Sequence, residues 1–238
     1  MNESLENKPP NRSYRYYDLV MVGFVTVLLC SNLIGPGKVC VIFGLSFGAG
    51  NLFFPISYIF GDILTEVYGY KRTRRVIWAG FAAMFFAVIM QQAVIRMPGD
   101  PSVPYSVALQ PALEMVFGSG WRIVLASMLA FWAGDFVNSF VMAKMKLLTN
   151  GRYLWTRTIG STMVGQSVDS ILFYPIAFAG LWGMKEMTNV ILFNIAFKVA
   201  VEIAFTPLTY KVVSFLKIAE HEDYYDLDTN FTPFSLRV

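Results

Sequence analysis

Charged residues are scarce in this chain, and their scarcity excludes an ordinary soluble domain. Of the 238 residues, 15% are charged and 55% are hydrophobic, whereas soluble domains carry about 25% charged residues. Such a composition is typical of a protein embedded in a lipid bilayer. The length accommodates six spanning helices of roughly 20 residues each. We therefore expect one membrane domain, with no additional soluble catalytic or nucleotide-binding domain.

Residues that support metal and hydrolytic chemistry are also few. The one histidine, His221, lies in a polar stretch, so a membrane-embedded histidine site for a metal or for a serine hydrolase lacks its base. Cys30 and Cys40 bracket one turn region, so we expect neither a disulfide framework nor a metal site. The chain has no Gly-x-x-x-x-Gly-Lys-Ser/Thr segment for ATP. We expect no cofactor.

Long apolar stretches predict an all-α, polytopic membrane protein with six transmembrane helices. We divide the chain into a polar tail at 1–16, a six-helix membrane domain at 17–218 and an acidic tail at 219–238. Both tails are polar enough that we expect them to be disordered. The expected spans cover residues 18–34, 51–69, 73–97, 121–145, 157–182 and 188–215.

Basic residues alternate between the two sides of these spans. The N-terminal tail and the even-numbered connectors hold most of them, and the odd-numbered connectors hold few. By the positive-inside rule, both termini are cytoplasmic and the protein crosses the inner (cytoplasmic) membrane several times. Membrane topology thus accounts for the net charge of +3 without a nucleic-acid partner.

Two connectors on the outer side are unusual. The stretch 39–68 is too long for one straight crossing and is punctuated by glycines, so we expect an extended or re-entrant piece before a helix. Residues Ser31 to Asn51 would line or close a cavity on the outer side, or form a surface loop rich in apolar residues. The proline-rich connector 98–120 ends in a short amphipathic run from Ala112 to Phe117, which could be a lid or a passive loop.

Small residues recur every four positions in the third and fourth spans, which lets helix backbones approach closely. They serve either packing within the chain or contact with a second copy in a homodimer. They are Ala79, Ala83, Ala87, Ala126, Ala130 and Gly134.

Ionisable residues lie deep inside the expected spans, where a charge is costly unless it faces a polar cavity or a partner. Counted from the span ends at about 1.5 Å per residue, most fall at a common depth. Helical spacing adds polar groups to the same faces. The set is Tyr58, Asp62, Glu66, Asp135, Asn138, Gln166, Asp169, Lys198 and Glu202.

Simple ion pairs are an alternative for some of these residues. Lys198 and Glu202 stand one turn apart on one helix, and Glu66 lies near the basic residues at 71–75. The three aspartates have no cation at an adjacent turn. Lys198 alone could not neutralise all the acids, so some must be protonated, solvated or aimed at donors of a ligand.

The residue types narrow the chemistry of that ligand. Carboxylates and amides match the adjacent N–H donors of a planar, guanine-like edge, and aromatic side chains offer faces for stacking. An organic cation or a proton relay would use the same acids. An intramembrane protease acting through Asp135 and Asp169 is a further alternative.

Several motifs also occur in a known family. Asp-x-x-Thr-Glu-x-Tyr-Gly at 62–69 and Gly-Gln-x-x-Asp-Ser at 165–170 are the most specific, and Ser31-Asn32 and Asp135 with Asn138 also match. On these residues the chain resembles the queuosine-precursor transporter family, also called the vitamin uptake transporter family. The resemblance extends from about Asn32 to Lys211.

The resemblance implies a carrier, not an enzyme, that imports 7-deazaguanine precursors of queuosine such as 7-cyano-7-deazaguanine or 7-aminomethyl-7-deazaguanine. It also implies a fold similar to the membrane-embedded substrate-binding subunits of energy-coupling-factor transporters, with residues 17–218 as the transport domain. A substrate-binding subunit that needs a separate ATPase and an intramembrane enzyme are the alternatives. The expected substrate-binding residues are Asn32, Tyr58, Asp62, Glu66, Asp135, Asn138, Gln166, Asp169, Lys198 and Glu202.

Overall fold

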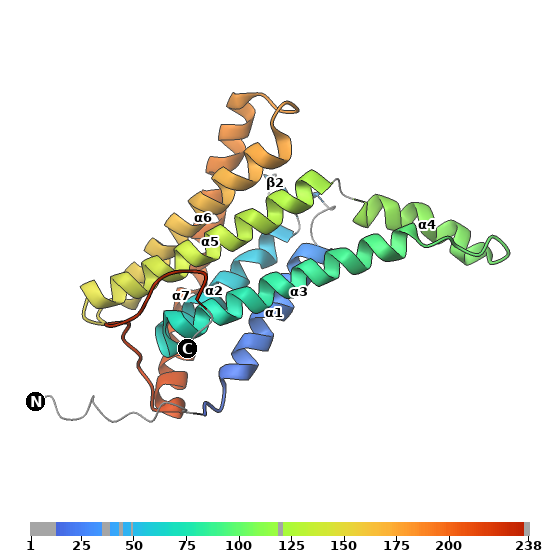
Figure 1. Cartoon of the computed structure of the whole chain (residues 1–238). Helices are drawn as coiled ribbons and strands as arrows, with labels where there is room; N and C mark the ends of the chain where they lie inside the picture. Colours follow the sequence, from blue (N-terminus) through green and yellow to red (C-terminus); the bar gives the residue numbers. More distant parts are fainter. Residues whose placement is uncertain (1–12, 35–38, 43–44, 49, 119–120, 236–238) are drawn as a thin grey trace, which may run out of the picture.

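The computed structural model describes residues 13–34, 39–42, 45–48, 50–118 and 121–235, and these are predominantly helical (Figure 1). One antiparallel hairpin, β1 with β2, precedes the second helix. The elements are α1 (Tyr17–Ile34), β1 (Val39–Ile42), β2 (Leu45–Gly48), α2 (Gly50–Tyr68), α3 (Tyr70–Arg96), α4 (Pro104–Phe117), α5 (Trp121–Leu148), α6 (Leu154–Phe178) and α7 (Met184–Glu220).

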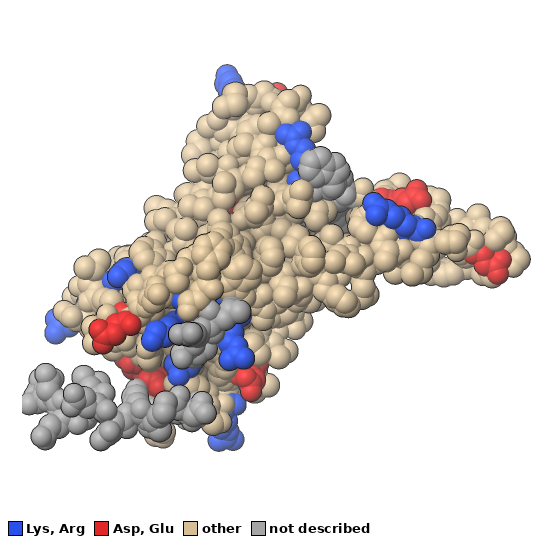
Figure 2. All heavy atoms as spheres, in the orientation of Figure 1, with Lys and Arg blue, Asp and Glu red and all other residues tan. Residues whose placement is uncertain are grey.

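Each expected span coincides with a helix, namely α1, α2, α3, α5, α6 or α7. Among the described residues, three helices are long and apolar enough to cross a bilayer: Tyr70–Arg96, Arg122–Leu148 and Met184–Glu220. Figure 2 shows an uncharged surface over much of the visible face, with basic residues gathered mainly at the end that carries the C-terminal tail. These features make the chain a helical membrane protein.

The connector between the third and fourth spans is more helical than expected. Helix α4 begins at Pro104, because a proline fits the first turn, where its missing N–H leaves no helical bond unmade. It folds back along α3, so that the two helices project together from the other helices (Figure 1). Gln110 ties them by donating to the carbonyl of Ile95 at 2.9 Å.

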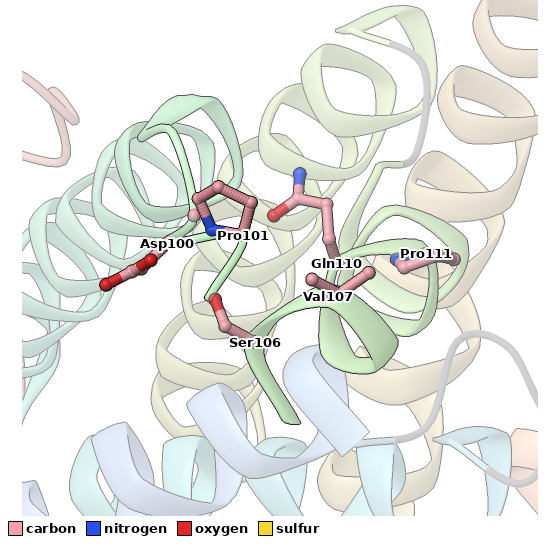
Figure 3. A pocket seen from close by; sticks show the side chains of 7 residues that line it. Asp100, Pro101, Ser106, Val107, Gln110 and Pro111 are labelled. Carbon is pink, nitrogen blue, oxygen red and sulfur yellow. The ribbon is translucent and has the colours of Figure 1, made fainter. Parts of the chain in front are cut away.

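A pocket of about 290 Å³ lies on this projection (Figure 3). It is lined by the turn after α3 and by one face of α4, and Asp100 holds that turn by accepting two hydrogen bonds from Ser102. These hydrogen bonds keep the pKa of Asp100 below its usual value. Since none of the expected substrate-binding residues lines it, this pocket is separate from the polar residues of the bundle.

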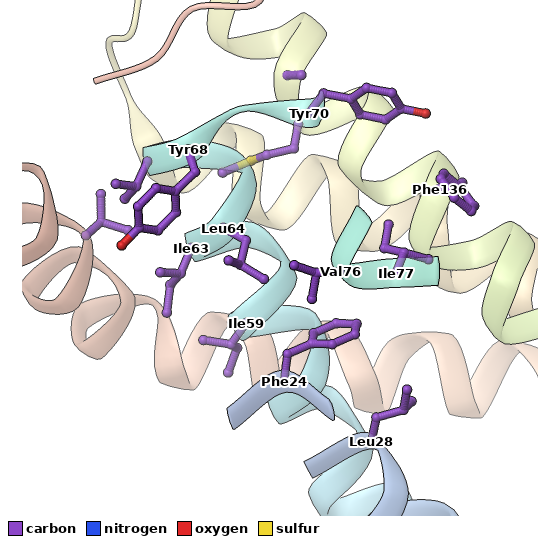
Figure 4. Close-up of a cluster of buried hydrophobic side chains, with 14 of the residues drawn as sticks. Phe24, Leu28, Ile59, Ile63, Leu64, Tyr68, Tyr70, Val76, Ile77 and Phe136 are labelled. Carbon is purple, nitrogen blue, oxygen red and sulfur yellow. The ribbon is translucent and has the colours of Figure 1, made fainter. Parts of the chain in front are cut away.

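A cluster of apolar side chains joins α1, α2, α3 and α5 (Figure 4). Phe24 and Leu28 from α1 are fully buried against Gly80 of α3, where an added Cβ would lie 2.9 Å from the Leu28 side chain. This packing fixes one side of α2 and turns its opposite, polar face toward α5, α6 and α7.

Helices α5 and α6 form the most extensive helix pair. A Cβ added at Gly165 would lie 2.8 Å from Asn138 Cβ and 3.0 Å from the carbonyl oxygen of Gly134. Ala126 and Ala130 on α5 are also buried within the chain, whereas the alanine stripe of α3 is not. The small residues of the fourth span therefore serve intramolecular packing.

Enlarging Gly165 should separate α5 from α6. We expect Gly165→Ala to destabilise the protein by about 1–3 kcal/mol through overpacking, which corresponds to a fall of roughly 2–4 °C in melting temperature per kcal/mol. Thermal unfolding in detergent measures the effect. Gly183→Ala is the matched control, because its added Cβ would meet no atom closer than 3.7 Å; equal melting temperatures for the two variants would contradict the close packing.

The expectation that both tails are disordered is wrong for residues 221–235 and for the described residues that precede α1. The backbone N–H of Tyr70 donates to Asp226 at 3.0 Å, and the buried Arg74 donates to the carbonyls of Asn230 and Thr232. The tail, drawn in red in Figure 1, runs back across this end of the bundle. It is ordered because buried donors of α3 bind its carbonyl and carboxylate oxygens.

The two tails also meet each other. Tyr14 donates its hydroxyl proton to Glu222 at 2.8 Å, and the backbone N–H of Tyr16 donates to Glu220. Gly69 lets the C-terminal tail approach closely, since an added Cβ would collide with the Tyr224 ring. We call this end of the molecule the tail side.

Candidate functional site

Three polar residues on α2 define three levels along the bundle. Tyr58, Asp62 and Glu66 follow one another at intervals of one turn, so they share one face of the helix, and each is 0% exposed. Each meets a different set of side chains from α5, α6 and α7. We name these sets the Lys198 layer, the Glu202 layer and the Glu66 layer, of which the last is nearest the tail side.

The Lys198 layer contains a buried ion pair. Lys198 donates from Nζ to Asp169 Oδ2 at 2.8 Å, and both side chains are almost enclosed. Tyr58 lies beside this pair, because a Cβ added at Gly134 would be 2.9 Å from its hydroxyl oxygen and 3.0 Å from Asp169 Cβ. Asp135 is within electrostatic range of Asp169 and Lys198. The layer thus places two carboxylates around one ammonium group.

The Glu202 layer is rich in acceptors and poor in donors. Asn138 donates from Nδ2 to Asp62 Oδ1 at 2.7 Å. Glu202, also 0% exposed, interacts electrostatically with Asp62. Within the described part of the chain, neither Glu202 carboxylate oxygen accepts a hydrogen bond, and the same holds for Asp62 Oδ2 and Asn138 Oδ1.

Unpaired buried polar atoms extend from this layer into the Lys198 layer. Leaving such an atom without a hydrogen bond costs about 1–3 kcal/mol, and more for a charged group. A group of such atoms favours a binding site, in which a small polar ligand or ion would supply the missing hydrogen bonds. Side chains with such atoms among the described residues include Tyr58, Asp62, Asp135, Asn138, Ser139, Thr162, Gln166, Ser170 and Glu202.

The Glu66 layer is a closed network of charges. Arg157 binds both carboxylate oxygens of Glu66 at 2.7 Å each, and Lys217 and Lys146 lie on the same carboxylate. Asp223 from the tail bridges the two lysines. Although burial opposes it, hydrogen bonds from Lys146 and Lys217 keep the pKa of Asp223 below its usual value. This network locks the tail side of the bundle.

Two of the ion pairs considered from sequence are wrong. Lys198 binds Asp169 and not Glu202. Glu66 is paired by cations of α5, α6 and α7, and none of its ion-pair partners among the described residues lies at 71–75.

Asn32 does not join the other expected residues. Its amide donates to the Leu28 carbonyl in its own helix and accepts from Ser127 at 3.3 Å. It therefore links α1 to α5 outside the three layers, whereas the other nine expected residues belong to the layers or lie against them.

Three residues of the Glu66 layer escaped the sequence reasoning: Lys146, Arg157 and Lys217. Because these residues lie near the ends of the expected spans, the sequence indicated only that they belong to the charged connectors. A signal was present for Lys146, which continues the polar face of Asp135 and Asn138 at helical spacing. Arg157 gave no such signal, because it lies nine and twelve residues before Gln166 and Asp169 and does not share their face on an ideal helix.

Apolar helices of membrane length that enclose buried, partly unpaired ionisable groups are the arrangement of a membrane transporter. Residues 48–212, which hold all of the three layers except Lys217 and Asp223, match the family model described as "Putative vitamin uptake transporter". The chain belongs to this transporter family and is not an enzyme, which confirms the predicted family.

A bacterial relative supports the same assignment. The "Probable queuosine precursor transporter" of Bacillus subtilis (strain 168) is 30% identical over 193 residues, which cover 80% of this chain and 81% of the relative. No solved structure matches the chain.

Proposed function

We propose that this protein imports a 7-deazaguanine precursor of queuosine, such as 7-cyano-7-deazaguanine or 7-aminomethyl-7-deazaguanine, across the inner membrane. The observation that carries the proposal is the group of buried carboxylate and amide atoms between α2, α5, α6 and α7 that have no hydrogen-bond partner among the described residues. The relative named as a queuosine precursor transporter supports the ligand class.

The ligand would bind in the Lys198 layer and reach the amides beside it. Asp135 and Asp169 would accept the adjacent N–H donors of the pyrimidine edge, because carboxylates match such pairs bidentately. Gln166, whose buried amide lies beside the Tyr58 hydroxyl, would bind the carbonyl or ring nitrogens together with Asn138. Phe54, whose ring centroid lies 4.8 Å from Lys198 Nζ, would cover one face of the ring.

The membrane arrangement follows from the same proposal. Six helices would cross the bilayer, as in the substrate-binding subunits of energy-coupling-factor transporters, with α4 on the outer face. Both termini would be cytoplasmic, so the Glu66 layer would close the cytoplasmic side. A homodimer would use the alanine stripe of α3, which the chain itself leaves unburied.

Uptake of labelled 7-cyano-7-deazaguanine into liposomes that contain only the purified protein tests this function. We expect uptake above that of protein-free liposomes, competed by unlabelled 7-deazaguanine but not by 7-deazaadenine, which lacks the paired N–H donors. A site built to bind such donors rejects an analogue without them strongly. Uptake that requires an added ATPase, or equal competition by both compounds, would contradict the proposal.

A further inference from the structure

The acids of the bundle do not form one uniform cluster. Asp169 is neutralised by Lys198 at 2.8 Å, and Glu66 is neutralised by Arg157 with two lysines. Between these two ion-paired layers lie Asp62 and Glu202, for which no salt bridge is found among the described residues. These two carboxylates therefore need a different counter-charge.

Among the described residues, the cations nearest to this pair are already engaged by other acids. On α2, Glu66 lies one turn from Asp62 and repels it. On α5, Asp135 is also close enough to repel Asp62. On α7, Lys198 one turn from Glu202 is engaged by Asp169, and the α6 cation Arg157 is engaged by Glu66. Asp62 also accepts a hydrogen bond from the uncharged Asn138.

Asn138 gives an independent indication that something binds here. Its side chain is 0% exposed, and its Nδ2 already donates to Asp62, while its Oδ1 accepts nothing within the described residues. The layer thus offers Asp62 Oδ2, Asn138 Oδ1 and two Glu202 oxygens as acceptors, with no donor left among them. A species that donates or carries positive charge would complete it.

We propose that Asp62 and Glu202 share one proton, and that this pair couples import of the ligand to movement of that proton. Two neighbouring buried carboxylates cannot both stay ionised, so one proton held between them satisfies both. The pair would take the proton from the outer side with the ligand and release it to the cytoplasm as an aqueous proton. No bond of the ligand changes.

The position of the pair suits this role. Asp62 lies one turn from Tyr58 of the Lys198 layer and one turn from Glu66 of the cytoplasmic network, so its charge acts on both. A proton there lowers the repulsion that Asp62 exerts on Asp135 and Glu66. The inference rests on the proposed function, because it concerns what travels with the same ligand.

The first experiment uses the wild-type protein in liposomes with the membrane potential clamped at zero. Exchange of labelled for unlabelled 7-cyano-7-deazaguanine tests the transport function itself. A gradient of about one pH unit, acidic outside, should then raise the internal ligand concentration up to about tenfold over the external one, because one proton per ligand carries that free energy. A dye inside should report ligand-dependent acidification.

The outcomes separate the two proposals. No exchange would overturn the proposed function, whereas exchange without accumulation or acidification would overturn the proton inference alone. Accumulation driven by a sodium gradient in place of the pH gradient would also overturn it.

Glu202→Gln and Asp62→Asn test the residues. Each keeps the shape of the side chain and removes the shared site, so labelled ligand should reach the same final concentration with and without the gradient, whatever its rate. Glu114→Gln on the exposed surface of α4 is the control and should keep the accumulation. If both variants still accumulate ligand, the proton is held elsewhere.

Discussion

We expect an Asp169→Asn variant to lose affinity and uptake by about 100-fold. Its carboxylate accepts from Lys198 at 2.8 Å, and both side chains are buried. Truncating one partner of a buried ion pair costs about 3–5 kcal/mol of folding stability. A hydrogen bond from a ligand donor to a charged carboxylate is worth about 1.5–3 kcal/mol, and each 1.4 kcal/mol is roughly tenfold in affinity. The variant also removes an acceptor for the N–H donors of the proposed ligand. Equilibrium binding of labelled 7-cyano-7-deazaguanine and its uptake into liposomes measure the two losses.

Two further variants make this prediction specific. Asp100→Asn carries the same change on the exposed turn after α3 and should bind normally. In Asp169→Asn with Lys198→Met, both charges are gone, so the melting temperature should recover while uptake stays low, since the lost acceptor is not replaced. Normal uptake in the double variant would remove Asp169 from the ligand site.

A Glu66→Gln variant loses stability more than any other single change that we propose. The Glu66 carboxylate is the shared partner of Arg157, Lys146 and Lys217, and it is 0% exposed. Removing the acid from a buried ion pair costs about 3–5 kcal/mol because it strands the opposite charge. At roughly 2–4 °C per kcal/mol for a chain of this size, the melting temperature should fall by about 6–20 °C.

Thermal unfolding in detergent measures this loss, and Glu114→Gln, which changes an exposed side chain of α4, should melt like the wild type. Asp223→Asn should have a smaller effect than Glu66→Gln, because the Asp223 side chain is 44% exposed and solvent screens its charge. If Asp223→Asn lowered the melting temperature more than Glu66→Gln, the tail and not Glu66 would hold the network together.

The helices were predictable because membrane helices need long apolar stretches, which are visible in any single sequence. The acids of the site stood out for the same reason, since a charge is conspicuous in an apolar span. Their partners were not predictable: Glu66 meets Arg157 and Lys217, which are 91 and 151 residues away along the chain. Helical spacing restricts pairs within one helix, but it says nothing about which helices face each other.

The sequence predicted neither the ordered tail nor helix α4, for two different physical reasons. The tail 219–238 has a composition typical of disorder, yet its described part, 221–235, is ordered by oxygens that accept from Arg74 and from the Trp78 indole. Amino-acid composition does not reveal such hydrogen bonds, because every residue type has a backbone carbonyl that can accept one. Helix α4 was hidden by its prolines, although Pro104 stands at the helix start, where proline is favourable.

The partners of Glu66 also have a consequence for how the protein is made. Helix α2 leaves the ribosome long before Lys146, Arg157 and Lys217 are synthesised, so Glu66 emerges before the cations that pair with it in the folded protein exist. The nascent chain must therefore keep α2 in a watery or protein-lined environment until α7 arrives. Truncated chains that stop before α7 should become substrates for membrane quality-control proteases, however well their remaining helices pack.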